Sequence, residues 1–365
     1  MSAAQLQPAL VGATLVLLLC TALPLLRLSH WSVRALDFPR LQLAFLACLL
    51  LLAQWLTLDV SRGASWALLL VAAGCLAWQL WWILPYTPLW RAEVRPAPGE
   101  DHTRRLRILT ANVLQSNRNA QALLDLVREY EPDVLVTMES DRWWQERLDQ
   151  LQDSMPHSIK CPLDNLYGMH VYSRLPLAHT ETAFLVEDDV PSMHCLLTLR
   201  DGTRVRMHFL HPAPPSPTEN EESAERDAEL VIVARSVAGT QRPVVVTGDL
   251  NDVAWSPTTR LFRKLSGLLD PRVGRGMFNT FHAGYPFLRW PLDHLFHSRH
   301  FTLRDMRRLP KIGSDHFALL TELVFTPGTG QEQAGMEADE ADWDWAQSIA
   351  QEKDVSYADV PRPAA

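Results

Sequence analysis

The chain has 365 residues, of which 47% are hydrophobic, and a formal net charge of -8 at pH 7. A sequence pI near 5.9 argues against a protein held on nucleic acid by a broad basic surface. Five cysteines give neither a disulfide framework nor the Cys/His spacing of a zinc site, so we expect any bound metal to have oxygen ligands.

Three long apolar runs without a charged residue precede residue 85, and each approaches the ~20 residues that span a bilayer. They are Pro8–Leu26, Leu41–Leu58 and Ala64–Leu84. Buried core helices are the alternative, but three such runs joined by short charged loops favour transmembrane helices. No Lys or Arg precedes the first run, so we expect it to remain as an anchor and not to be cleaved as a signal peptide.

Composition divides the rest of the chain. We expect a transmembrane region over residues 1–84, a proline-rich linker over 85–102, a globular domain over 103–326 and an acidic tail over 327–365. The tail has nine acidic residues against two basic ones, which predicts disorder, although its aromatic residues could dock on the domain. No feature identifies a protein partner.

The globular domain begins with a β-α-β pattern: a strand at Leu106–Val113, an amphipathic helix at Ala120–Tyr130 and a strand at Asp133–Met138. This order brings Asn112 and Glu139 to one edge of a sheet. Glu139 is then a candidate ligand for a hard cation such as Mg²⁺. The alternative is a glutamate that caps the helix starting near Asp141.

Further along the chain, polar residues again follow predicted strands. A hairpin of His194–Leu199 and Val205–His211 leaves His211 at the start of a proline-rich loop. The β-branched run after Pro243 ends in Asp249 and Asn251, which share a face of an extended chain. A packing histidine and an Asx-type turn are the alternatives.

The last part of the domain contains a loop and two more candidates. Residues 279–290 are aromatic and basic without periodicity, as in a substrate-binding loop, and lead into a strand that carries Asp293. Asp315 and His316 lie in a Gly-Ser-Asp-His turn before the apolar strand Phe317–Val324.

Four of these motifs, around Asn112, Glu139, Asp249 with Asn251, and Ser314 to His316, stand in an order that resembles the endonuclease/exonuclease/phosphatase superfamily of DNase I-like proteins. The resemblance covers about residues 103 to 326. It implies an α/β four-layer sandwich of two packed mixed β-sheets flanked by helices, with loops at one edge forming the site.

The resemblance also implies roles. Mg²⁺ or Mn²⁺ would be held mainly by Glu139, with Asp315 and Asn112 contributing. Asp249 would align or deprotonate the attacking water, with Asn251 orienting it. His316, steadied by Asp293, would contact the phosphate charge together with His211, and Asn112 would contact the scissile phosphate or the metal's water.

One departure from the pattern concerns substrate choice. Many nucleases of the family have an aspartate two residues after the asparagine, where this chain has Leu114. We therefore expect a membrane-anchored, metal-dependent phosphoester hydrolase whose substrate is a nucleic acid, a nucleotide or a lipid headgroup. The alternatives are a phospholipid or inositol-phosphate hydrolase, and a membrane-tethered binding protein that has lost turnover.

The arginines beside the three predicted helices predict an inner (plasma) membrane protein with a cytoplasmic catalytic domain. Eight of the nine lie in the first loop or after the third helix, on one side of the membrane, and basic loops favour the cytoplasm. They are Arg27, Arg34, Arg40, Arg91, Arg95, Arg104, Arg105 and Arg107, and Arg62 is the exception. Alkaline phosphatase fused after Ala365 should therefore be inactive, and a fluorescent reporter there should fluoresce. An active phosphatase fusion would contradict this orientation.

Overall fold

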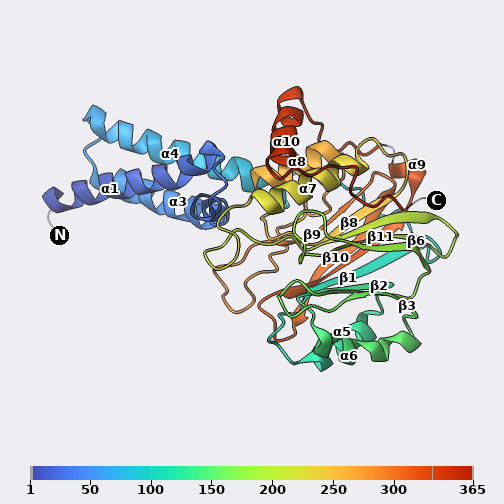
Figure 1. Cartoon of the computed structure of the whole chain (residues 1–365). Coiled ribbons are helices and arrows are strands. Elements are labelled where there is room, and N and C mark those ends of the chain that lie inside the picture. The colour runs from blue at the N-terminus through green and yellow to red at the C-terminus, as the bar shows by residue number, and fades with distance from the viewer. Residues whose placement is uncertain (1–2, 100, 331, 364–365) are drawn as a thin grey trace. The chain divides into compact units, whose positions relative to one another are not determined.

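The computed structural model describes residues 3–99, 101–330 and 332–363, and the chain forms two compact units. The first unit comprises the residues up to 90 together with residues 215–223. The second comprises residues 91–214 and the chain from residue 224 onward. Each unit is described separately (Figure 1).

The first unit contains three helices long and apolar enough to cross a membrane: α1 (Ala3–Ala22), α3 (Arg40–Thr57) and α4 (Gly63–Ile83). The candidate spans have mean hydropathies of 2.4, 1.6 and 1.9 in chain order. Four short helices connect or extend them: η1 (Leu23–Leu26), α2 (Trp31–Arg34), η2 (Ala35–Asp37) and η3 (Leu84–Tyr86). The three predicted apolar runs therefore correspond to helices.

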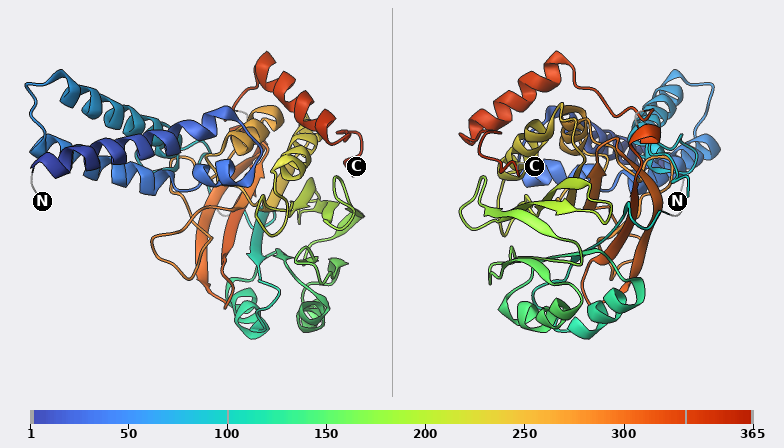
Figure 2. Two further views of the ribbon diagram at one scale, coloured as in Figure 1. Left: turned by 60° about the vertical axis from the view of Figure 1, so that its left-hand side comes forward. Right: turned by 90° about the vertical axis from the view of Figure 1, so that its right-hand side faces the viewer.

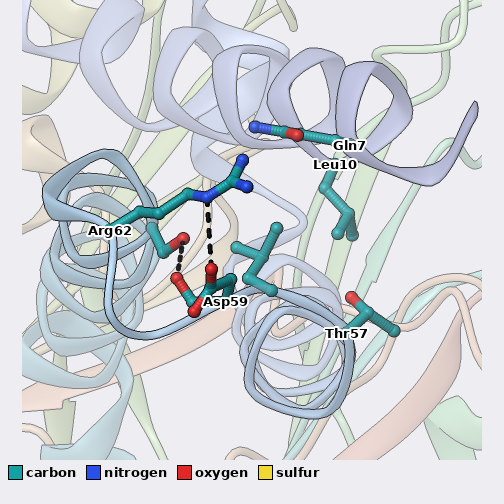
Figure 3. Close-up of a pocket in the computed structure, with 7 residues that line it drawn as sticks. Gln7, Leu10, Thr57, Asp59 and Arg62 are labelled. Carbon is teal, nitrogen blue, oxygen red and sulfur yellow. Dashed lines mark hydrogen bonds and ion pairs between the residues drawn. The ribbon is translucent and has the colours of Figure 1, made fainter. Parts of the chain in front are cut away.

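Polar side chains link the long helices. The Gln54 amide in α3 donates to the Thr14 hydroxyl of α1 at 2.8 Å, and the Gln79 amide in α4 donates to Thr21 at 3.0 Å. In an apolar surrounding such bonds fix how helices pack, because an unpaired polar group would be costly. At one end of the bundle, Gln7, Leu10 and Thr57 line a pocket with the paired Asp59 and Arg62 (Figure 3).

The second unit is built on two mixed β-sheets. The six-stranded sheet has the order β10-β11-β1-β2-β4-β3, and the five-stranded sheet has the order β5-β6-β7-β8-β9. The strands of the first are β1 (Arg105–Asn112), β2 (Val134–Met138), β3 (His157–Cys161), β4 (Met169–Ser173), β10 (Phe301–Lys311) and β11 (Phe317–Phe325). Those of the second are β5 (Leu177–Ala183), β6 (Ser192–Thr198), β7 (Arg204–Leu210), β8 (Val244–Asp249) and β9 (Asp293–His297).

Helices cover the outer face of each sheet, so the unit has the four layers predicted (Figures 1 and 2). On the six-stranded sheet lie α5 (Ala120–Tyr130) and α6 (Arg142–Leu148), which is followed by η4 (Asp149–Asp153). Outside the five-stranded sheet lie α7 (Ala224–Val237) and α8 (Pro257–Ser266). The largest apolar cluster fills the space between the sheets, and one further cluster lies under each helical layer.

Two parallel strand pairs define the functional edge. β1 pairs with β2, and β7 pairs with β8, each in parallel. Parallel neighbours end at the same edge of a sheet, so Asn112 and Glu139 emerge together from one sheet, and His211 and Asp249 from the other. The predicted β-α-β unit and the predicted hairpin of β6 and β7 are both confirmed.

Two sequence expectations need correction. The acidic tail was expected to be disordered, but it forms α9 (Pro327–Gly330) and α10 (Glu340–Glu352), and α10 buries Ala346, Ile349 and Ala350 in the cluster under α7 and α8. Three apolar residues on one helical face outweigh the acidic composition, and Asp342 pairs with Lys264 of α8 at 2.6 Å. Residues 91–97 of the expected linker belong to the second unit, where Glu93 forms an ion pair with Arg263.

A buried acid in α7 makes stability depend on pH. Burial raises the pKa of the Glu229 carboxyl to about 8, and Glu187 adds to the shift. The folded state keeps a proton that the unfolded chain releases above its ordinary pKa of 4.5, so stability should fall as the pH rises from about 4.5 to about 8. Glu229→Gln should remove this slope and stabilise the protein at pH 8 by on the order of 3 kcal/mol.

Urea denaturation in detergent micelles at several pH values measures this effect. Glu146→Gln, at an exposed position of α6, is the matched control and should leave the slope unchanged. Parallel pH curves for Glu229→Gln and the native protein would contradict the prediction.

Candidate active site

The side chain of Asn112 connects the two sheets at the functional edge. Its Nδ2 donates to Glu139 Oε1 at 2.7 Å, beside β2, and to Asp249 Oδ2 at 3.1 Å, at the end of β8. Below this contact the hydroxyls of Thr110 and Thr247 lie 3.2 Å apart. Residues distant in the sequence thus form one polar centre.

Close backbone packing positions Asp249. A Cβ at Gly248, where φ is +150°, would lie 1.9 Å from the carbonyl oxygen of Leu210, so only glycine fits before the aspartate. The backbone N–H of Asn251 then donates to Asp249 Oδ1 at 3.0 Å. The carboxylate is therefore held from both sides before any substrate binds.

Glu139 is a partly exposed carboxylate among other acids. Burial raises the pKa of Glu139 to about 7, against the opposing effect of the Asn112 hydrogen bond and His316, while Asp315 and Asp249 raise it further. Its Oε2 accepts the backbone N–H of Gln115 at 3.4 Å. The residue itself has a φ of +54°, a conformation unusual for glutamate. Such strain is typical of functional positions.

His316 lies between two carboxylates. Its Nδ1 is 2.8 Å from Asp293 Oδ2, and its Nε2 is 3.5 Å from Asp249 Oδ2. Burial alone would lower the pKa of His316, but Asp249 and Asp293 outweigh burial and raise it to about 10. Burial likewise acts to raise the pKa of Asp249, yet His316 and His211 bring it below its ordinary value. The centre therefore holds an imidazolium beside an ionised carboxylate.

His211 differs from the expectation of a charge-neutralising group. Full burial lowers its pKa to about 4, although Asp249 acts in the opposite direction. The ring packs 5.5 Å from the ring of Tyr167. His211 is consequently neutral at pH 7, and it can donate a hydrogen bond but carries no charge.

The structure gives Asn251 and Asn112 different contacts from those inferred. The Asn251 side chain donates to the carbonyl of Pro212 at 3.0 Å, so its backbone, and not its amide, orients Asp249. The Asn112 oxygen accepts the N–H of Leu114 at 3.0 Å. Asn112 thus acts as a donor between carboxylates and, in this orientation, does not offer its oxygen to a metal.

Leu114 stands where many nucleases of the resembled family have an aspartate. The neighbouring Gln115 and Asn117 do not replace that carboxylate, because their side chains bond the backbone of Asp164 and Leu166, and of Val113 and Ile312. In this turn the Gln115 backbone N–H donates to Glu139, and no side chain of Leu114, Gln115 or Asn117 supplies a carboxylate.

Buried groups that the sequence did not reveal support the centre from behind. Arg226 of α7 is 1% exposed and donates to the Asn251 carbonyl at 2.8 Å and to Asp227. His294 bridges Arg272 and the Asp252 carbonyl at 2.7 and 2.8 Å. Both sets fix the loop after Asp249. The sequence gives no signal of this burial for Arg226, which stands between Glu225 and Asp227 at the polar start of α7.

Ser314 ties the last motif to the first. Its hydroxyl donates to the Asn112 carbonyl at 2.8 Å and accepts the N–H of His316 at 2.9 Å. Asp315 lies close enough to act on the pKa values of Glu139 and His316. All eight predicted site residues are therefore gathered around one edge, although their contacts differ as described.

Two clusters of acidic residues are candidates to hold a cation. Ligand atoms of Asp249, Asp293 and His316 lie within 4.8 Å of one another, but an imidazolium has no lone pair for a metal. Glu139 fits better, because its partly exposed carboxylate has a raised pKa and a neighbouring acid in Asp315. Carboxylate oxygens of this kind suit Mg²⁺ or Mn²⁺.

Comparison with known proteins gives a family and a fold. The model of the Endonuclease/Exonuclease/phosphatase family matches residues 109–316. No curated protein matches the chain. Among solved structures, D. rerio TDP2 humanized by 14 mutations is similar, with 17% identity, a TM-score of 0.52, and coverage of 60% of this chain and 99% of that one.

Two other structures show the same fold. The human Nocturnin catalytic domain with a bound sulfate has 17% identity and a TM-score of 0.50, and covers 61% of this chain and 94% of that one. An endonuclease/exonuclease/phosphatase from Beutenbergia cavernae has 18% identity and the same TM-score, covering 61% and 72%.

Arg226 provides a test of the supporting contacts. Arg226→Met leaves Asp227 and Asp252 buried without their guanidinium, so the free energy of unfolding should fall by about 3 to 5 kcal/mol. Arg128→Met, on the exposed face of α5, should change it by less than about 0.5 kcal/mol. Equal urea midpoints for the two variants would show that the Arg226 network is not needed for the fold.

Proposed function

Because the chain belongs to the endonuclease/exonuclease/phosphatase family, we propose that it is a membrane-anchored, divalent-metal-dependent phosphoester hydrolase. The observation that carries the proposal is the buried trio of Asn112, Asp249 and His316, in which an ionised carboxylate and an imidazolium lie 3.5 Å apart beside Glu139. This arrangement offers a group for an attacking water and a positive charge for a phosphate.

Glu139 would hold Mg²⁺ or Mn²⁺, with Asp315 contributing from the facing turn. The ion, when bound, neutralises charge on the phosphoryl oxygens and on the leaving oxygen. Asn112 keeps Glu139 and Asp249 at a fixed separation, so the cation site and the water site are set at once.

Asp249 would align the attacking water and accept its proton. Its lowered pKa keeps it ionised at pH 7, and the hydrogen bond from the Asn251 N–H holds one of its oxygens in place. As the water oxygen bonds to phosphorus, its proton passes to Asp249 and the phosphorus–oxygen bond to the leaving group breaks.

His316 would stabilise the charge that develops on the phosphoryl oxygens. Asp293 accepts from Nδ1, fixes the ring and favours its charged form, which leaves the Nε2 proton for the phosphate. His211 would add a hydrogen bond as a neutral donor. In this proposal only His316 carries a positive charge, and His211 is neutral.

Several substrates share this chemistry. One similar structure, D. rerio TDP2, is described in complex with a single-stranded DNA product (17% identity, TM-score 0.51, 60% and 98% coverage), which keeps a nucleic acid open. The acidic chain and the three candidate spans favour a phosphoester at the membrane. We place the catalytic unit on the cytoplasmic face of the inner membrane.

An activity panel tests the proposal. The full-length protein in detergent would be assayed on plasmid DNA, bis(para-nitrophenyl) phosphate and phospholipid, with Mg²⁺ or with EDTA. We expect turnover of at least one substrate with Mg²⁺ and none with EDTA. Failure on all of them would favour a binding protein that has lost turnover.

Two variants separate the proposed roles. Glu139→Ala should weaken Mg²⁺ binding at least about tenfold, whereas Asp249→Ala should keep metal affinity close to normal and lower kcat by about 10³-fold. Calorimetry of Mg²⁺ binding and steady-state kinetics measure the two effects. If Asp249→Ala lost the metal as fully as Glu139→Ala, the division between metal and water would be wrong.

A further inference from the structure

Residues 281–290, here called the aromatic hairpin, form a loop beside the candidate active site. The backbone pairs at its base, where Phe281 N–H donates to the Trp290 carbonyl at 3.0 Å. The orange segment that precedes β9 extends away from the sheets (Figure 2). The ring of Phe281 lies 4.9 Å from that of His316, and Ala283 N–H donates to the Asp315 carbonyl at 2.5 Å. The hairpin is thus fixed to the site at its base.

The tip of the aromatic hairpin is apolar and exposed. Tyr285 is 57% exposed, Phe287 85% and Leu288 47%. Phe287 is more exposed than any other large apolar side chain described in the second unit. Single exposed apolar residues are common, but three within four positions of one loop mark a surface for an apolar partner.

Basic side chains surround the base of the tip. Arg289, Arg308 and Lys311 all lie around the ring of Phe317, at 5.1, 4.3 and 5.9 Å from its centre. Arg308 also donates to the Asn279 carbonyl at 2.8 Å, which holds its charge next to the hairpin. In an anionic bilayer the apolar tip would lie among the acyl chains, and the three cations at its base would lie at the level of the anionic headgroups.

We propose that the aromatic hairpin inserts its tip into an anionic bilayer, and that the adjacent site hydrolyses phosphoesters carried by membrane lipids. The second half rests on the proposed function, whereas the docking does not. Three candidate membrane spans on the same chain would tether the second unit to a bilayer. A single nucleic-acid strand could stack on the aromatic rings, but Leu288 offers no such face, and an apolar tip gains from burial in acyl chains, which a nucleic acid does not supply.

Site-specific fluorescence tests the docking. The full chain, carrying Cys48→Ala, Cys161→Ala and Phe287→Cys, would be labelled with an environment-sensitive fluorophore in nanodiscs of phosphatidylcholine with one quarter phosphatidylglycerol. Doxyl-labelled lipids should quench this label about twofold. Phe184→Cys, at an exposed phenylalanine of the same unit, is the matched control and should not be quenched. Equal quenching at both positions, or none at Phe287→Cys, would overturn the docking.

Turnover separates docking from hydrolysis. Phe287→Ser should lower the ratio of phosphatidylglycerol hydrolysis to bis(para-nitrophenyl) phosphate hydrolysis about tenfold, and Phe184→Ser should leave this ratio unchanged. An unchanged ratio for Phe287→Ser, or a native protein that cleaves the soluble diester but no lipid, would overturn the lipid substrate. Quenching without turnover of either compound would overturn the proposed function and leave the docking supported. Protection of the label by an oligonucleotide in place of lipid would identify a nucleic-acid surface.

Discussion

A single amide holds the candidate site together. The Nδ2 of Asn112 donates at once to a carboxylate from each sheet, Glu139 beside β2 and Asp249 at the end of β8. Two neighbouring carboxylates repel one another, and a neutral donor between them offsets part of that cost. The site consequently exists only where the two sheets are packed, because neither sheet alone supplies both partners of the amide.

The charge pattern around this amide explains why the site suits a cation together with a phosphate. Glu139, Asp249 and Asp293 bring three carboxyl groups to one edge, against the single imidazolium of His316. The excess appears in the raised pKa of Glu139 and in that of Asp293, which burial and Asp249 both raise. The carboxylates would repel a bare phosphate, whereas a divalent ion bound with the phosphate would offset this repulsion.

Local patterns were enough to predict the functional edge, and the fold class followed from the resemblance that four short motifs carry. β-branched runs that end in Asn112, Glu139 or Asp249 identify strand ends, because a polar residue after an apolar strand needs solvent or a partner. The order of strands and helices then implies which ends meet. Uncharged runs of about twenty residues identified the spans for an equally local reason.

The remaining features depend on three-dimensional surroundings. Whether His211 is charged depends on its burial against Tyr167, and whether Arg226 is solvated depends on Asn251, which lies 25 residues away in the sequence. The same holds for the tail, whose acidic composition predicts disorder, although one face of α10 is apolar and packs against α7 and α8. Desolvation and long-range pairing are not encoded in any window of a few residues.

Because α10 packs on α7 and α8, the folded second unit extends beyond its last strand to include this helix. A chain that stopped at Thr326, after the last strand, would keep every strand pairing of the two sheets and all of the site residues. It would nevertheless uncover the apolar cluster that Ala346, Ile349 and Ala350 complete, together with the neighbouring Val360. Such a shortened chain would keep the candidate site but expose apolar surface that favours self-association, so a segment outside the site completes the fold of the unit.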